Sequence, residues 1–78
     1  MKYVYILQSE QADRFYVGLT GDPEVRLAAH NAGDSTHTSK YRPWTLRTVV
    51  AFADEAKAVA FERYLKTASG RAFAKKRF

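Results

Sequence analysis

The sequence predicts an α+β domain in which helices flank a small, mostly antiparallel sheet, with the element order β-β-α-β-α-α. Two segments, residues 2–8 and 14–20, alternate in side-chain character with the period of two that is typical of strands. The short polar segment between them favours a β-hairpin. Three helical patterns follow, and a third apolar strand, residues 46–53, separates the first of them from the other two. Helices that follow a hairpin and flank a third strand in this way indicate the α+β class.

The length and composition indicate one small domain, residues 1–78, with a partner that carries negative charge. A chain this short buries only about 60–65% of its unfolded surface. It has no cysteine, so no disulfide and no cysteine-ligated zinc site stabilises it. We expect a cytoplasmic protein without a membrane partner, because we find no signal peptide and no apolar run that spans a bilayer. The formal net charge of +5 favours nucleic acid as a partner, although it also suits ordinary solubility.

The first helix has clear start and stop signals. Asp22 can cap free N–H groups, Pro23 suits the first helical position, and Gly33 is expected to end the helix. Arg26 and His30 are four residues apart and therefore lie together on the helix surface. Beside them we predict an apolar stripe that packs on the sheet, formed by Val25, Ala28, Ala29 and Ala32.

The second half of the chain predicts a polar loop, a strand and two more helices. The loop covers residues 33–45, and its Trp44 is expected to fill the small core. Asp54 caps a helix that runs to about Thr67, and Gly70 is expected to break the pattern before a short basic helix. The apolar stripe of the longer helix is predicted to consist of Ala58, Phe61, Leu65 and Ala68.

Two tyrosines of the hairpin are candidates for a site. If Tyr5 pairs across from Tyr16 or Gly18, both tyrosines face the same side of the sheet. Gly18 leaves that side open beside them, where a ligand or a backbone can approach closely. Strand tyrosines more often serve packing, so the pair by itself favours a structural role.

Glu62 is the most informative single residue. It lies between Phe61 and Leu65 and points toward the apolar face of its helix. A carboxylate in that position is costly unless it is paired, protonated or bound to a cation. The alternative is a boundary residue that forms an i, i+4 ion pair with Lys66.

Other polar residues point to phosphate chemistry, each with a plain alternative. The guanidinium of Arg26 suits a phosphate, or else it forms a solvated ion pair with Glu24 or Asp22. His30 could act as a general base or as a hydrogen-bond donor, or it could be a polar residue near a helix end. The chain has no Gly-rich phosphate loop and no HExxH motif.

Basic residues gather in the middle loop and near the C-terminus. In the loop they alternate with aromatic residues, which suits phosphate neutralisation and base stacking on a nucleic acid. Those near the C-terminus contact phosphate or form a solvated helix end. The residues that we predict to bind nucleic acid are Lys40, Arg42, Lys66, Arg71 and Lys75.

Five short segments in this order resemble the GIY-YIG nuclease superfamily. The chain looks most like its small stand-alone bacterial members, related to the N-terminal incision domain of the excision-repair endonuclease. The resemblance covers essentially the full chain and implies a three-stranded antiparallel sheet flanked by helices. The segments are YVYIL (3–7), YVGLT (16–20), RLAAHNAG (26–33), SKYRP (39–43) and FERYLK (61–66).

The resemblance implies a metal-dependent endonuclease, a hydrolase of phosphodiester bonds, which acts on DNA rather than RNA in repair or recombination. Glu62 would hold Mg²⁺ or Mn²⁺ with no small-molecule cofactor, and Arg26 would stabilise charge on the phosphate. Tyr5 would help to activate the attacking water, with Tyr16 or His30 sharing the proton path, and the identity of the base stays open. The alternative is a nucleic-acid-binding module that keeps the fold with weak or absent turnover. No oligomeric state is predicted.

Overall fold

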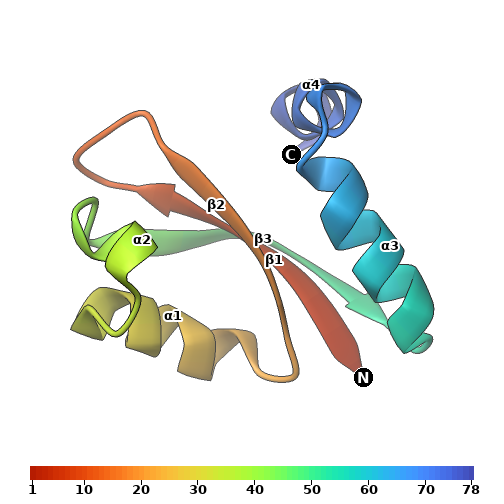
Figure 1. The fold of residues 1–78 in the computed structure, drawn as a ribbon, viewed down its shortest axis with the longest axis horizontal. Helices are drawn as coiled ribbons and strands as arrows, with labels where there is room; N and C mark the ends of the chain where they lie inside the picture. Colours follow the sequence, from red (N-terminus) through yellow and green to blue (C-terminus); the bar gives the residue numbers. More distant parts are fainter.

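The computed structural model describes all of residues 1–78 and confirms the predicted fold class. Three antiparallel strands form one sheet in the order β2-β1-β3. Helices α1 and α2 lie on one face of the sheet, and α3 and α4 lie on the other (Figure 1). No helix has the length and apolar character needed to cross a membrane. The elements are β1 (Lys2–Ser9), β2 (Phe15–Thr20), α1 (Pro23–Ala32), α2 (Thr36–Ser39), β3 (Trp44–Phe52), α3 (Glu55–Leu65) and α4 (Ala68–Arg77).

The hairpin register places both tyrosines on one face, as predicted. Tyr5 pairs with Gly18, and Leu7 pairs with Tyr16. Since side chains alternate across a strand, Tyr5 and Tyr16 face α1 while Ile6 faces α3.

Each face of the sheet has its own small core. On the α3 face, the buried residues are Val4, Ile6, Ala58 and Leu65, and partly buried residues of β2 and α4 pack around them. On the α1 face, the buried residues are Tyr5, Leu7 and Trp44. The second core is therefore rich in side chains with polar atoms, and those atoms need partners.

The predicted apolar stripe of α1 is wrong, although the helix itself and its Asp22 cap are confirmed. The helix instead turns Leu27, His30 and Asn31 toward the sheet. Two of these are polar, and Asn31 bonds the backbone of Trp44 in both directions. A search for apolar periodicity misses this face of α1 because polar side chains attach it to the sheet through hydrogen bonds. The stripe residues that the structure leaves exposed are Val25, Ala28 and Ala32.

The predicted loop at residues 33–45 is only partly a loop. Its middle forms the one-turn helix α2, and β3 begins at Trp44, two residues before the predicted start. Trp44 is buried, as predicted, and its indole N–H donates to the carbonyl oxygen of Thr38 at 2.9 Å. This bond fixes α2 against the start of β3.

Gly70 does not break the last helices. The interruption falls at Lys66 and Thr67, and α4 begins at Ala68, which is exposed and takes no part in an α3 stripe. A Cβ atom at Gly70 would overlap the carbonyl oxygen of Tyr64. Glycine is needed here because the first turn of α4 approaches the end of α3 closely.

The space beside Gly18 is not left open for a ligand, contrary to expectation. The Tyr5 ring itself lies over Gly18, and a Cβ atom there would overlap the ring and the hydroxyl oxygen. Tyr5 is only 1% exposed. Gly18 thus provides the space that the Tyr5 ring occupies.

We predict that Gly18→Ala destabilises the protein while Gly21→Ala does not. The added methyl group meets a fully buried ring, and overpacking of this kind costs about 1–3 kcal/mol. No atom lies within 4 Å of a Cβ placed at Gly21, so that variant is the matched control. Urea unfolding of the two variants measures the difference, and equal stabilities would contradict the packing described here.

Candidate active site

A chain of three buried side chains lies between the sheet and helices α1 and α2. The Tyr5 hydroxyl is 2.9 Å from Nε2 of His30, and Nδ1 of His30 is 2.8 Å from the hydroxyl oxygen of Thr38. All three residues are nearly inaccessible to solvent. Both ring nitrogens of His30 therefore have fixed partners, one on β1 and one on α2.

The imidazole of His30 is neutral at neutral pH. Burial lowers the pKa of His30, and the positive charge of Arg26 lowers it further. Either neutral tautomer satisfies both contacts, because the hydroxyl groups of Tyr5 and Thr38 can each donate or accept. In the tautomer whose Nδ1–H donates to Thr38, Nε2 accepts from the Tyr5 hydroxyl, and the Tyr5 proton then has an acceptor.

Arg26 lies against the same hydroxyl group. Burial raises the pKa of Tyr5, while a hydrogen-bonding interaction with the Arg26 guanidinium opposes that rise. The same interaction raises the pKa of Arg26. Because Arg26 is exposed to solvent, its guanidinium remains accessible to a phosphate.

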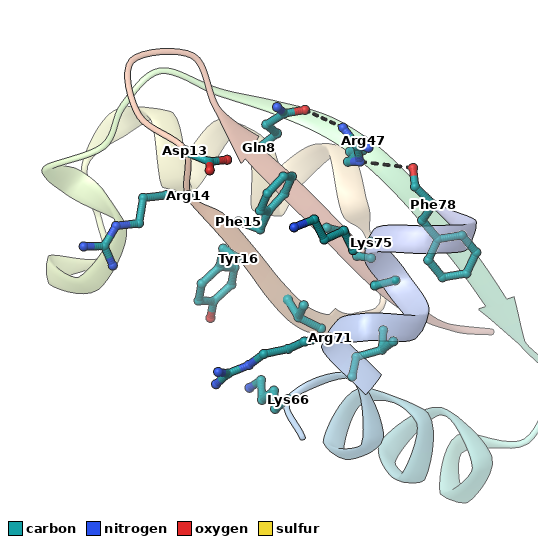
Figure 2. A pocket seen from close by; sticks show the side chains of 14 residues that line it. Gln8, Asp13, Arg14, Phe15, Tyr16, Arg47, Lys66, Arg71, Lys75 and Phe78 are labelled. Atoms are coloured by element: carbon teal, nitrogen blue, oxygen red, sulfur yellow. Dashed lines mark hydrogen bonds between the residues drawn. The ribbon is translucent and has the colours of Figure 1, made fainter. Parts of the chain in front are cut away.

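Tyr16 forms the outer part of this cluster. Its ring centroid lies 4.7 Å from that of His30 and 6.2 Å from that of Tyr5. Unlike Tyr5, Tyr16 is partly exposed, and it belongs to the edge strand β2. Its hydroxyl group points away from the sheet on the side of Lys66 and Arg71 (Figure 2).

Glu62 comes from the helix layer on the opposite face of the sheet. Its side chain is 17% exposed, and its Oε2 is 2.6 Å from Nζ of Lys66, the only ion pair in the chain. The ion pair with Lys66 is the one that the alternative interpretation predicted, and the carboxylate is also partly shielded from solvent. Burial raises the pKa of Tyr5, and the positive charge of Lys66 is the weakest of the effects that oppose this rise. Lys66 also lines a pocket with Tyr16. Lys66 thus connects Glu62 to the tyrosine face around the β2 edge.

The donor set fits a divalent cation with a single protein ligand. The structure contains no group of three His, Cys, Asp or Glu residues that could hold a metal ion. Mg²⁺ is commonly bound by one or two carboxylates, with waters and substrate phosphate oxygens completing the shell. Glu62 suits that role, and a cation there would compete with Lys66 for the carboxylate.

The predicted nucleic-acid-binding residues fall into two groups. Lys40 and Arg42 lie near α2, where the Arg42 Nε–H donates to the carbonyl oxygen of Ser39 at 2.9 Å. The other three line a pocket of about 840 Å³ on the α4 side (Figure 2), and they are Lys66, Arg71 and Lys75.

The sequence analysis missed several residues of this region. Thr38 gave no signal, because it is one of several hydroxyl residues in a polar segment and its partner His30 is eight residues away. Arg47 and Phe15 were also missed, although both line the pocket beside Lys75. Only the register of the sheet and the path of α4 bring them together.

These features define the catalytic domain of a nuclease family. Residues 1–77 match the family described as the GIY-YIG catalytic domain, and the chain belongs to that family. The chain spans about a fifth of the Structure-specific endonuclease subunit SLX1 of Scheffersomyces stipitis, with 42% identity over 67 residues, 76% of this chain and 20% of that protein.

Shorter relatives match over most of their own length. A UPF0213 protein of Halobacterium salinarum is 34% identical over 70 residues, which are 88% of this chain and 90% of that protein. A UPF0213 protein of Staphylococcus haemolyticus is 35% identical over 68 residues, 86% of this chain and 82% of that protein. No solved structure matches the chain significantly.

We predict that His30 makes the stability of the protein depend on pH. Its pKa is lowered in the folded state, so the unfolded chain binds more protons below about pH 6.5. The free energy of unfolding should therefore fall as the pH drops below that value, by at most about 1.4 kcal/mol per pH unit for one proton.

Unfolding at a series of pH values, compared between His30→Gln and His37→Gln, measures this effect. His37 is exposed, so His37→Gln should keep the pH dependence of the wild type. His30→Gln should lose the His30 part of the slope, and an unchanged slope in that variant would contradict the assignment.

Proposed function

We propose that this chain is a divalent-metal-dependent endonuclease that hydrolyses phosphodiester bonds in DNA. The observation that carries the proposal is the buried Tyr5 hydroxyl, which lies 2.9 Å from Nε2 of His30 and so has a nitrogen that can take up its proton. Membership of the GIY-YIG catalytic domain family supports the reaction class.

The buried side chains favour a proton relay over a free phenolate. Burial raises the pKa of Tyr5, so its hydroxyl group is protonated at rest. A water that attacks phosphorus can give its proton to the Tyr5 oxygen while Tyr5 passes its own proton to Nε2 of His30. His30 then ends the reaction as an imidazolium, and Thr38 holds the ring in place.

Arg26 links substrate binding to this relay. Its guanidinium interacts with the Tyr5 hydroxyl and would shield it from water while no phosphate is bound. A phosphate that draws the guanidinium outward would open the hydroxyl group to the attacking water. The same guanidinium would then stabilise the charge that grows on the phosphate oxygens.

Glu62 is the proposed metal ligand. A Mg²⁺ or Mn²⁺ ion bound to it would polarise the scissile phosphate and stabilise the leaving oxygen. Lys66, displaced from the carboxylate, would remain near the β2 edge as a positive charge for the substrate.

A DNA substrate and a role in repair or recombination, with a cytoplasmic location, complete the proposal. The similarity to structure-specific endonuclease subunits supports the assignment of DNA. The resemblance to an excision-repair incision domain supports the biological role. The activity of the larger SLX1 proteins bears on this chain only through the matched segment.

We predict that Glu62→Gln and Arg26→Ala each lower metal-dependent cleavage by at least about 100-fold, as is usual when a group that stabilises the transition state is lost. Glu55→Gln is the matched control, because Glu55 lies exposed on the same helix and forms no ion pair. Conversion of supercoiled plasmid to nicked plasmid with Mg²⁺ or Mn²⁺ gives the rates.

Undiminished cleavage by both site variants would contradict the assignment of Glu62 and Arg26 to the active site. Salt-sensitive DNA binding by the wild type, with no product under any metal, would instead favour the alternative of a binding module.

A further inference from the structure

We infer that the pocket between β2 and α4 binds an unpaired nucleotide segment of the substrate. This inference rests on the proposed nuclease function for one point only, that the bound strand continues to the scissile phosphate. The pocket lies on the α3 and α4 side of the sheet and reaches the β2 edge at Tyr16 (Figure 2). The site of the proposed proton relay lies around that edge, on the other face.

The charge of the pocket selects for an anion with several phosphates. Five basic side chains and one carboxylate line it, and only one of the basic groups has a carboxylate partner. Such a density of unpaired positive charge disfavours the binding of cations and of peptides with few acidic residues. It favours the binding of a phosphate backbone. The basic residues are Arg14, Arg47, Lys66, Arg71 and Lys75.

An aromatic platform in the same pocket suits a base. Phe15 lines the pocket and is 51% exposed, so part of its ring is available to a ligand. The guanidinium carbon of Arg47 lies 5.3 Å from the centre of this ring, and Lys75 extends toward it (Figure 2). Arg47 is itself held by its Nη1–H bond to Gln8 at 2.7 Å and its Nε–H bond to the carbonyl oxygen of Phe78 at 3.1 Å. The platform is therefore built before any ligand arrives.

The size of the pocket favours a single strand over a duplex. Its volume of about 840 Å³ lies in the range of sites for small ligands. A base can stack on Phe15 only when it is unpaired and free to leave its own stack. Phosphates on either side of that base would meet Arg71 and Lys75 on α4.

The test measures binding without cleavage, in EDTA, by fluorescence anisotropy. The probes are a labelled oligothymidylate of about 12 nucleotides, within the range that small single-strand sites cover, and a blunt duplex of the same length. Unlabelled thymidine monophosphate serves as a competitor, which separates a strand site from a site for free nucleotides.

Two charge variants on one helix provide a matched comparison. The double variant Arg71→Ala with Lys75→Ala removes two charges that line the pocket, and Lys76→Ala with Arg77→Ala removes two that do not. The first should weaken single-strand binding by at least about tenfold and lower the salt dependence by about one to two released ions. The second should change the affinity by less than about twofold. Equal effects of the two pairs would overturn the inference.

Phe15→Leu tests the platform with the apolar volume largely kept. It should weaken single-strand binding by about fivefold or more, the lower range for a lost base stack, and leave duplex binding within about twofold. An unchanged single-strand affinity would overturn the inference, as would competition by thymidine monophosphate at the concentrations at which the oligonucleotide binds.

The two proposals fail separately. Single-strand binding through the pocket without cleavage in Mn²⁺ would contradict the nuclease function and leave the pocket assignment intact. Cleavage by the wild type, together with equal single-strand affinities of the two charge variants, would contradict the pocket assignment and leave the nuclease function intact.

Discussion

The packing of the Tyr5 ring over Gly18, with its hydroxyl group on His30, is the contact on which the rest of this half of the molecule depends. The hairpin register brings the glycine under the ring. The hydroxyl group then defines where α1 must place His30, and His30 in turn defines where α2 must place Thr38. Since an unpartnered buried polar group costs about 1–3 kcal/mol, each partner in this chain fixes the next. A site built in this way is held in place by hydrogen bonds between its own side chains.

In the proposed function, the distribution of charge brings the substrate and the proposed catalytic groups together at the β2 edge. The buried chain on one face supplies proton acceptors, and the pocket on the other face supplies positive charge. Arg26 is exposed on α1, and Lys66 follows the end of α3 and lines the pocket. The ion pair between Glu62 and Lys66 places the carboxylate beside the pocket. The edge strand thus becomes the place where a phosphate can contact both sets of groups.

Local signals in the sequence predicted the framework well. Alternation in the hairpin predicted that Tyr5 and Tyr16 share a face, and Asp22 and Asp54 predicted two helix starts, because these features depend on neighbouring residues. What failed depends on distant contacts. The packing face of α1 is held by hydrogen bonds from His30, whose Tyr5 partner is 25 residues away. Apolar periodicity carries no record of such a face.

The dependence on distant contacts also limited what the sequence could predict about the candidate active site. The structure brings Tyr5, Tyr16 and His30 together, while Glu62 belongs to α3, which packs on the other face of the sheet. The sequence showed that this carboxylate was shielded and could pair with Lys66, and it did not show on which face of the sheet α3 packs. Gly70 was misread for a similar reason, since its role is set by the close approach of α4 to Tyr64.

Paramagnetic relaxation by Mn²⁺, followed by NMR of the aromatic side chains, tests most directly whether Glu62 and the tyrosine face form one site. Relaxation falls steeply with distance from the ion, so it locates the metal relative to each ring. We expect Mn²⁺ to broaden the Tyr16 and Tyr5 ring signals in the wild type and to lose this effect in Glu62→Gln. Broadening that leaves both tyrosines untouched, or that persists in Glu62→Gln, would contradict the account.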